Sequence, residues 1–179
     1  MTHPPHLLHV FSTFNAAGPQ LRIASTINHL GQEFRHTIIA MDDNFDAQYC
    51  LDGSSEVSFL PPPEKRSAWK VPLVFRDLLL KLNPDLVLTY NWGAIEAVAG
   101  TLLARRPRVI HNEAGFGAHE AMRRTKRRVL ARRVLLRGAF RTLVPSKKLL
   151  QIAREEYRLP TSKVQYIANG VDTERFRPE

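Results

Sequence analysis

The feature that most constrains the fold of this chain is a regular alternation of short apolar runs with amphipathic segments. The apolar runs lack strict polar alternation, and we predict strands there, over residues 6–14, 37–41, 57–60, 85–90, 108–110, 142–144 and 164–168. Helical spacing of apolar residues predicts helices over residues 19–30, 71–82, 93–104, 119–138 and 146–157. Strands buried on both faces and joined by helical crossovers form parallel sheets. The sequence therefore predicts an α/β fold, a Rossmann-like doubly wound parallel sheet of about seven strands.

Length and composition limit the class of protein. Hydrophobic residues make up 44% of the 179 residues, which is ordinary for a globular protein. No apolar run reaches the roughly 18 residues that a membrane-spanning helix needs. The single cysteine, Cys50, excludes an internal disulfide framework and makes a thiolate metal cluster an unfavourable interpretation. The N-terminal sequence lacks the basic region and cleavage site of a signal peptide. We therefore expect a cytoplasmic protein.

The loops that follow the predicted strands hold the candidate site, because ligands of doubly wound sheets bind beyond the carboxyl ends of the strands. The first loop contains Ala17, Gly18 and Pro19 directly before a helix. Its backbone N–H groups could face a phosphate, or the loop could be a plain tight turn. It does not match GxGxxG, so it is a poor dinucleotide site. The loop after the fourth strand brings Asn91 and Trp92, which can hydrogen-bond to a sugar or stack on it.

The loop after the fifth strand is the most polar and glycine-rich of the set, with the sequence HNEAGFG over residues 111–117. His111 and Glu113 together could perform general acid–base chemistry or bind hydroxyl groups. The alternative is a hydrogen-bonded histidine near the core beside a solvated loop acid. The chain contains no GxSxG elbow, Walker loop or metal-ligand spacing. We therefore predict no metal site and no cofactor.

Positive charge is concentrated in one predicted helix. The chain has 26 Lys and Arg against 17 Asp and Glu, a formal net charge of +9. The basic segment comprises Arg123, Arg124, Lys126, Arg127, Arg128, Arg132, Arg133, Arg137 and Arg141. An apolar stripe of Met122, Val129, Leu136 and Phe140 is expected to pack on the sheet. The arginines then form either a solvated face or a membrane- or anion-binding surface, at about 1 kcal/mol per basic side chain near anionic lipid. Nucleic acid fits less well, because aromatic side chains are not interleaved with the charges.

Several motifs together resemble a known enzyme family. The segments PDLVLTYNWGAIEAVAG, RVIHNEAGFG, TLVPSKKLLQIA and KVQYIANGVDTERFRPE occur in the order and spacing of retaining glycosyltransferases of the GT-B fold, family 4 (group 1). The resemblance covers nearly all of the chain from His9 onward. It implies that residues 1–179 are one Rossmann-like N-terminal, acceptor-binding domain, and that the C-terminal donor-binding domain is absent because the sequence stops at the junction. It also implies a nucleotide-sugar donor as co-substrate, retention of anomeric configuration and no metal.

The resemblance also assigns roles by position. Near the donor phosphates it places Ala17, Gly18 and Pro19. Along the acceptor cleft it places Asn91, Trp92, Gly115 and Phe116. Beside the reacting sugar it places the candidate catalytic residues His111 and Glu113. Related sequences often carry a histidine or acid where Ala114 stands, so the chemistry at that point stays open. The basic helix fits members that modify lipid-linked or cell-envelope glycan acceptors, with a peripheral position on the inner membrane face.

Two alternatives to a glycosyltransferase half stay open from the sequence. One is a non-catalytic Rossmann-like module that binds anionic lipid or nucleic acid through the arginine-rich helix. The other is a small phosphosugar-processing enzyme, which would need His111 and Glu113 as a complete acid–base pair. The sequence names neither the sugar, the nucleotide nor the acceptor.

Overall fold

The computed structural model describes residues 3–64, 69–115 and 125–170, and its centre is a parallel sheet. The strands are β1 (His6–Phe11), β2 (Arg35–Ala40), β3 (Glu56–Leu60), β4 (Leu86–Tyr90), β5 (Arg108–Asn112), β6 (Arg141–Val144) and β7 (Val164–Tyr166). They lie in the order β3-β2-β1-β4-β5-β6-β7, and each neighbouring pair is parallel. This order is that of the Rossmann fold, with a topological switch between β1 and β4. The predicted fold class is confirmed.

The helices agree closely with the predicted ranges. They are α1 (Gly18–Leu30), α2 (Val71–Leu82), α3 (Ile95–Ala104), α5 (Lys126–Gly138) and α6 (Lys147–Glu155). Short 3-10 helices, which the apolar spacing did not predict, are η1 (Gly31–Glu33), η2 (Asp46–Cys50), η3 (Trp92–Ala94) and η4 (Thr161–Lys163). The predicted helix over residues 119–138 is described only from Lys126 onward. Among the described helices, none has both the length and the apolar character needed to cross a bilayer.

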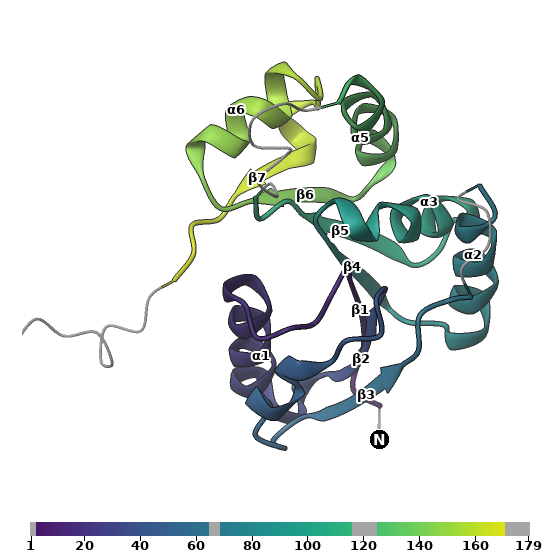
Figure 1. Cartoon of the computed structure of the whole chain (residues 1–179), viewed down its shortest axis with the longest axis vertical. Helices are drawn as coiled ribbons and strands as arrows, with labels where there is room; N and C mark the ends of the chain where they lie inside the picture. The colour runs from purple at the N-terminus through teal and green to yellow at the C-terminus, as the bar shows by residue number, and fades with distance from the viewer. Residues whose placement is uncertain (1–2, 65–68, 116–124, 171–179) are drawn as a thin grey trace, which may run out of the picture.

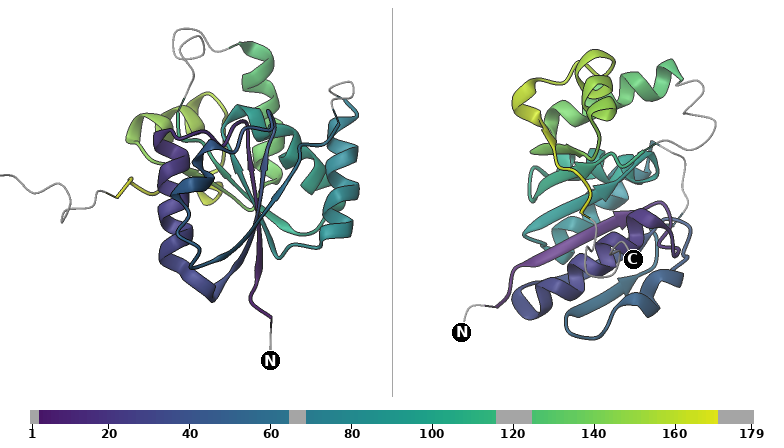
Figure 2. Two further views of the ribbon diagram at one scale, coloured as in Figure 1. Left: turned by 60° about the horizontal axis from the view of Figure 1, so that its bottom comes forward. Right: turned by 90° about the vertical axis from the view of Figure 1, so that its left-hand side faces the viewer.

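Helices cover both faces of the sheet (Figures 1 and 2). One face packs against α2, α3, α5 and α6, which contribute Phe75, Val98, Leu136 and Ile152 to the larger buried cluster. Helices α2 and α3 approach closely at Gly100 of α3, where a Cβ atom would lie 2.4 Å from Phe75 Cβ. The other face of β1 and β2 packs against α1 and η2.

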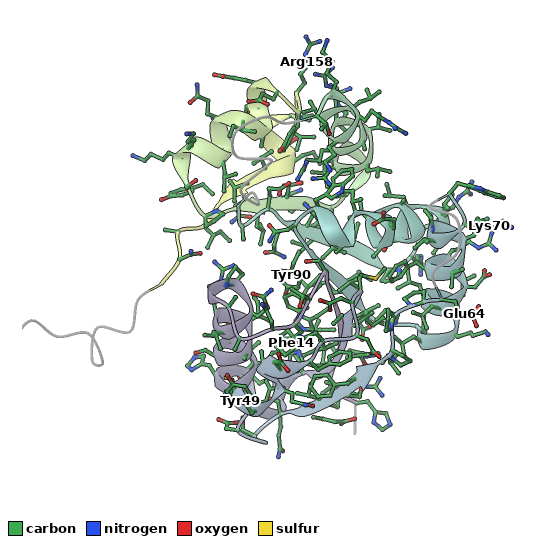
Figure 3. The ribbon with its side chains drawn as sticks, in the orientation of Figure 1. Phe14, Tyr49, Glu64, Lys70, Tyr90 and Arg158 are labelled. Carbon is green, nitrogen blue, oxygen red and sulfur yellow. The ribbon has the colours of Figure 1, made fainter. Side chains whose placement is uncertain are left out.

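An aromatic cluster fills the layer beneath α1. The Phe11 ring stacks on Tyr90 at a centroid distance of 4.0 Å and contacts Phe14 at 5.0 Å. Phe14 and Tyr90 lie inside the molecule in Figure 3, whereas Tyr49 points outward. Stacked and tilted ring pairs of this kind contribute stability beyond the area they bury. The cluster anchors the carboxyl end of β1 to that of β4.

Three buried histidines, His6 and His9 on β1 and His36 on β2, form hydrogen bonds between neighbouring strands. His9 Nδ1 lies 2.9 Å from the Tyr90 hydroxyl, and His9 Nε2 lies 3.0 Å from His36 Nδ1. His6 Nε2 lies 2.8 Å from Thr37 Oγ1. Burial, together with the neighbouring His36 and His6, lowers the pKa of His9 to about 3. The imidazole of His9 is therefore neutral near pH 7, and its hydrogen bonds compensate for its burial.

Candidate functional site

The carboxyl ends of β4, β5 and β6 are aligned side by side in the sheet. Tyr90 pairs with Asn112, and Asn112 pairs with Leu143. Two hydrogen bonds continue this ladder into the loops: Asn91 N–H donates to the Asn112 carbonyl at 2.8 Å, and Glu113 N–H donates to the Leu143 carbonyl at 2.9 Å. The loops after β4 and β5 are therefore brought together, as predicted from the parallel strands.

Asn91 connects these two loops. Its backbone has φ of 57° and ψ of −172°, a conformation that is otherwise almost confined to glycine. Its side-chain oxygen accepts a hydrogen bond from the Ala114 N–H at 2.8 Å. The amide thereby holds the backbone of the β5 loop at Ala114. The Asn91 side chain is half-buried, so part of it is accessible to a ligand. Its predicted contact with the acceptor stays a prediction.

Gly93 allows the loops on either side of the topological switch to meet. A Cβ atom at this position would lie 2.1 Å from the Ser12 Cβ and 3.1 Å from the Ser12 Cα. Non-bonded carbon atoms do not approach to 2.1 Å, so a larger residue would force the loops after β1 and β4 apart. The requirement for glycine here is steric and brings the first loop against the β4 loop.

A buried ion pair lies directly beneath the β5 loop. Arg132 Nε donates to Glu113 Oε2 at 2.7 Å, and Arg132 Nη2 donates to Oε1 at 3.3 Å. Both side chains are almost fully buried. Burial alone would raise the pKa of the Glu113 carboxyl, but contacts with His111 and Arg132 outweigh this effect and leave that pKa below its usual value. Glu113 is therefore an ionised carboxylate held by its arginine partner and not a solvated loop acid.

His111 is enclosed beside this pair. Its Nδ1 lies 2.9 Å from Thr89 Oγ1. Its Nε2 lies 3.7 Å from Glu113 Oε2, which is longer than a hydrogen bond, and has no hydrogen-bond partner among the described residues. The alternative interpretation of His111 as a residue near the core agrees with its complete burial. The predicted catalytic role of His111 and Glu113 stays a prediction, and the geometry favours a positioning role for both.

The inner face of the basic helix packs on aromatic rings. The Arg128 and Arg132 guanidinium groups each lie 5.0 Å from the Trp92 ring centroid, and Arg132 lies 5.4 Å from that of Tyr157. Arg133 Nη2 donates to the Glu156 carbonyl at 2.9 Å. The prediction that Arg132 lies on the solvent-facing or membrane-binding surface is wrong, because its charge is neutralised in the interior by Glu113. Trp92 is half-buried, and its ring lies against both the Arg128 and the Arg132 guanidinium groups.

The outer face of α5 is basic and partly apolar. Lys126, Arg127 and Arg137 are exposed, and between them Leu130 and Val134 are 58% and 61% exposed. Of the predicted apolar stripe, Leu136 is buried and Val129 half-buried, whereas Phe140 lies after the helix and is 37% exposed. Its assignment to the stripe was wrong because the helix ends at Gly138. Outside the described residues lie Phe116, Met122, Arg123 and Arg124.

The first loop leads into α1 without a side-chain cap. Ala17 is the N-cap residue, Pro19 occupies the first turn, and this turn contains no acidic residue. A Cβ at Gly18 would meet nothing within 4 Å, so the helix end faces open space. The first backbone N–H groups of a helix lack carbonyl partners within the helix and attract anions. The arrangement agrees with a phosphate-facing loop, and no ligand contact tests the predicted role of Ala17, Gly18 and Pro19.

A hollow of about 300 Å³ lies between α1 and the ends of β5 and β6. Its walls include Arg22, Asn112, Glu113, Leu143 and the segment that leaves β7. A second, smaller hollow joins Arg22 to Gly18, Pro19 and Ala114. The Arg22 guanidinium donates to the side-chain oxygen of Asn169 in the segment after β7, which runs toward α1 in Figure 1.

Sequence reasoning missed Arg22 as a site residue. The available signal was its position one helical turn beyond Gly18, because residues three or four apart share one helix face.

Comparison with a family model gives a match over most of the chain. The model for Glycosyltransferase Family 4 matches residues 16–175, a range that contains all of the loops described above. No curated protein sequence matches the chain.

Solved structures with the same fold include glycosyltransferases and an epimerase. The chain is similar to a glycosyltransferase from Rickettsia africae, with a TM-score of 0.65 and 14% identity over 98% of this chain and 46% of that one. HepE from Anabaena, in complex with UDP and glucose, gives a TM-score of 0.64 and 14% identity over 94% and 45%. UDP-GlcNAc 2-epimerase from Neisseria meningitidis, bound to UDP-GlcNAc, gives a TM-score of 0.59 and 17% identity over 90% and 46%.

These similarities show the fold, and the chain spans less than half the length of each of these structures. The family match is independent of them and covers far more than half of the sequence. The chain belongs to glycosyltransferase family 4.

Proposed function

We propose that this chain is the acceptor-binding half of a nucleotide-sugar-dependent, retaining glycosyltransferase that transfers a hexosyl group. The observation that carries the proposal is the hollow at the carboxyl edge of a family 4 module, where the uncapped start of α1 and Arg22 face the loops after β5 and β6. The solved relatives are about twice as long as this chain. A second, donor-binding half is therefore part of the proposal, and the chain alone is expected to be inactive.

A nucleotide-sugar donor suits the α1 side of the hollow. Two structures of the same fold hold UDP with glucose or UDP-GlcNAc. In this chain, the free N–H groups at the start of α1 and the open side of Gly18 offer an anion site for the donor phosphates. In this proposal the acceptor lies against the opposite wall, which the β5 loop forms. Asn91 holds that loop through Ala114, and neither Asn91 nor Trp92 lines the hollow itself.

In this proposal His111 and Glu113 hold the β5 loop and do not react with the sugar. Glu113 reaches Arg132 with both carboxylate oxygens, and His111 is enclosed between Thr89 and Glu113. A carboxylate in a bidentate pair is a weak base, since protonating it would leave a buried arginine unpaired. The groups left to contact the acceptor from this half are backbone amides and the half-buried side chains at the loop surface.

A lipid-linked acceptor at an anionic membrane surface suits the outer face of α5. Lys126, Arg127 and Arg137 would contact lipid headgroups, while Leu130 and Val134 would enter the interface between headgroups and acyl chains. Each basic side chain near such a surface contributes about 1 kcal/mol of attraction. A peripheral, cytoplasmic location on the inner membrane face is part of this proposal.

The test compares the 179-residue chain alone with the same chain joined to a donor-binding half from its own gene or from a family 4 relative. Both proteins are incubated with radiolabelled UDP-glucose or UDP-GlcNAc and a bacterial lipid extract. We expect incorporation of the sugar into lipid only by the joined protein, with the anomeric configuration of the donor retained by NMR. Turnover of the nucleotide sugar by the isolated chain at the same rate would refute the proposal.

A further inference from the structure

A third hollow, lined by basic side chains, lies at the opposite, amino edge of the sheet. It has a volume of about 230 Å³ and lies where α3 ends, where β5 begins and where the turn between α5 and β6 meets η4. Three of its lining residues are basic, namely Arg105, Arg108 and Lys163, and none is acidic. We call this hollow the amino-edge site. It shares no residue with the hollows at the carboxyl edge.

The helix ends nearby account for only part of this positive charge. The helices α3 and α5 both end here, and each C-terminus carries the equivalent of about half a negative charge. Two cations bind to backbone carbonyl groups just beyond the end of α5. Lys163 Nζ donates to the Ala139 carbonyl at 2.8 Å, and Arg141 Nη1 donates to the Phe140 carbonyl at 2.9 Å. Arg105 and Arg108 form no side-chain hydrogen bond or ion pair with any described residue. The charges of Arg105 and Arg108 are therefore not neutralised by an ion pair within the described part of the chain.

An aromatic ring holds two of the guanidinium groups in place. Arg108 lies 4.6 Å and Arg141 lies 4.8 Å from the centroid of Phe140, which is itself 37% exposed. A guanidinium that stacks on a ring keeps the N–H groups at its edge free. Those N–H groups match the spacing of two oxygens on a phosphate. The stack thus presents donors in a fixed orientation beside the hollow.

The backbone of Arg105 gives an independent indication. It ends α3 in the left-handed region, with φ of 62° and ψ of −8°, and its N–H bonds to the Thr101 carbonyl at 3.1 Å. Helices that end in this way usually carry glycine at the left-handed position, because a Cβ disfavours that conformation. This strained backbone is consistent with a role for the side chain itself. The exposed side chain of Arg105 lines the amino-edge site.

We propose that the amino-edge site binds the phosphate group of a ligand, which is either a free phosphate-bearing molecule or a phospholipid headgroup. A doubly charged, tetrahedral oxyanion matches three cations that line one hollow better than a single carboxylate does. Arg105 and Arg108 supply the charged N–H donors, Lys163 supplies a further ammonium donor, and Phe140 forms an apolar wall. The site is separate from the proposed donor and acceptor hollow, and the proposal does not depend on the glycosyltransferase activity.

The experiment titrates the 179-residue chain with sodium pyrophosphate by isothermal calorimetry at low ionic strength. The test variants are Arg105→Gly and Arg108→Gln. The matched control is Arg154→Gln, which removes the same charge from an exposed position on α6. Arg22→Gln distinguishes this site from the carboxyl-edge hollow, which is proposed to bind donor phosphates and is therefore expected to take up pyrophosphate as well. Each test variant is expected to bind about tenfold more weakly, since a charged hydrogen bond is lost.

Folding of the variants is checked by circular dichroism. Arg105→Gly is expected to unfold at a higher temperature than the parent chain, because glycine relieves the left-handed strain. Loss of binding together with greater stability would exclude unfolding as the cause. No binding of pyrophosphate by the parent chain would overturn the proposal. Equal weakening in Arg154→Gln, or weakening in Arg22→Gln alone, would overturn it as well.

The source of the phosphate is distinguished by vesicle sedimentation, with phosphatidylcholine alone and with added phosphatidic acid. Loss of binding to phosphatidic acid in both test variants, but not in Arg154→Gln, identifies a lipid headgroup. Unchanged vesicle binding with weakened pyrophosphate binding identifies a soluble phosphate-bearing ligand. Both results support the amino-edge site.

Discussion

Arg132→Met tests whether the buried ion pair holds the candidate site together. Arg132 contacts both oxygens of Glu113 and lies against the rings of Trp92 and Tyr157. Methionine has a similar length and no charge, so it can fill most of the space between the rings. What the substitution removes is the counter-charge of Glu113, which remains almost fully buried.

The expected magnitude follows from the burial of both partners. Removing one member of a buried pair costs about 3–5 kcal/mol, because the remaining charge is left without compensation. In a chain of this size, each kcal/mol lowers the melting temperature by about 2–4 °C. We therefore expect Arg132→Met to melt about 6–20 °C below the parent chain. Such a loss is a large share of a typical folding free energy of about 5–15 kcal/mol.

The assay is thermal and urea unfolding, monitored by circular dichroism and tryptophan fluorescence. The double variant Glu113→Leu with Arg132→Met should recover part of the loss, since it leaves no unpaired charge. Vesicle binding should stay at the parent level in folded Arg132→Met, because Arg132 is not on the outer face of α5. A loss below about 1 kcal/mol would refute the buried pair, since surface ion pairs contribute no more than that.

Three further predictions concern other parts of the structure. Between pH 6.5 and about 3, unfolded His9 binds a proton that the folded residue excludes, so each unit of falling pH lowers the free energy of unfolding by about 1.4 kcal/mol from this residue. Urea midpoints measured from pH 7.5 to 5 check this, and a flat profile contradicts a neutral buried imidazole. Gly93→Ala should cost about 1–3 kcal/mol, because its Cβ collides with Ser12, and an unchanged melting temperature would show that the loops are not in contact. Leu130→Ser with Val134→Ser should weaken sedimentation with anionic vesicles at unchanged thermal stability, whereas equal sedimentation would refute insertion of these side chains.

The fold was predictable because local and global signals agree. The helix over residues 71–82 was predicted at its observed bounds, and every predicted strand overlaps an observed one. Apolar runs of a few residues between amphipathic segments allow few arrangements other than a parallel sheet. The short 3-10 helices were not predictable in this way, because single turns have no periodic pattern to recognise.

Side-chain partnerships were the part that the sequence did not indicate. Arg132 is one of several arginines in a row, and a charge run carries no mark of the member that turns inward to meet Glu113. His6, His9 and His36 showed no ligand spacing, and their network depends on strand order rather than on sequence distance. These contacts form across the sheet between residues far apart in the chain, so only the tertiary structure reveals them.

The segment after β7 has a consequence for how the carboxyl-edge hollow can respond to a ligand. Ile167, Ala168, Asn169 and Gly170 form one wall of that hollow, and Arg22 bonds to Asn169 across it. The direction in which the backbone leaves the sheet after β7 therefore helps to set the width of the hollow. A ligand that binds in the hollow and a contact that holds this segment are then coupled through one shared wall, and each changes the affinity for the other by the same factor.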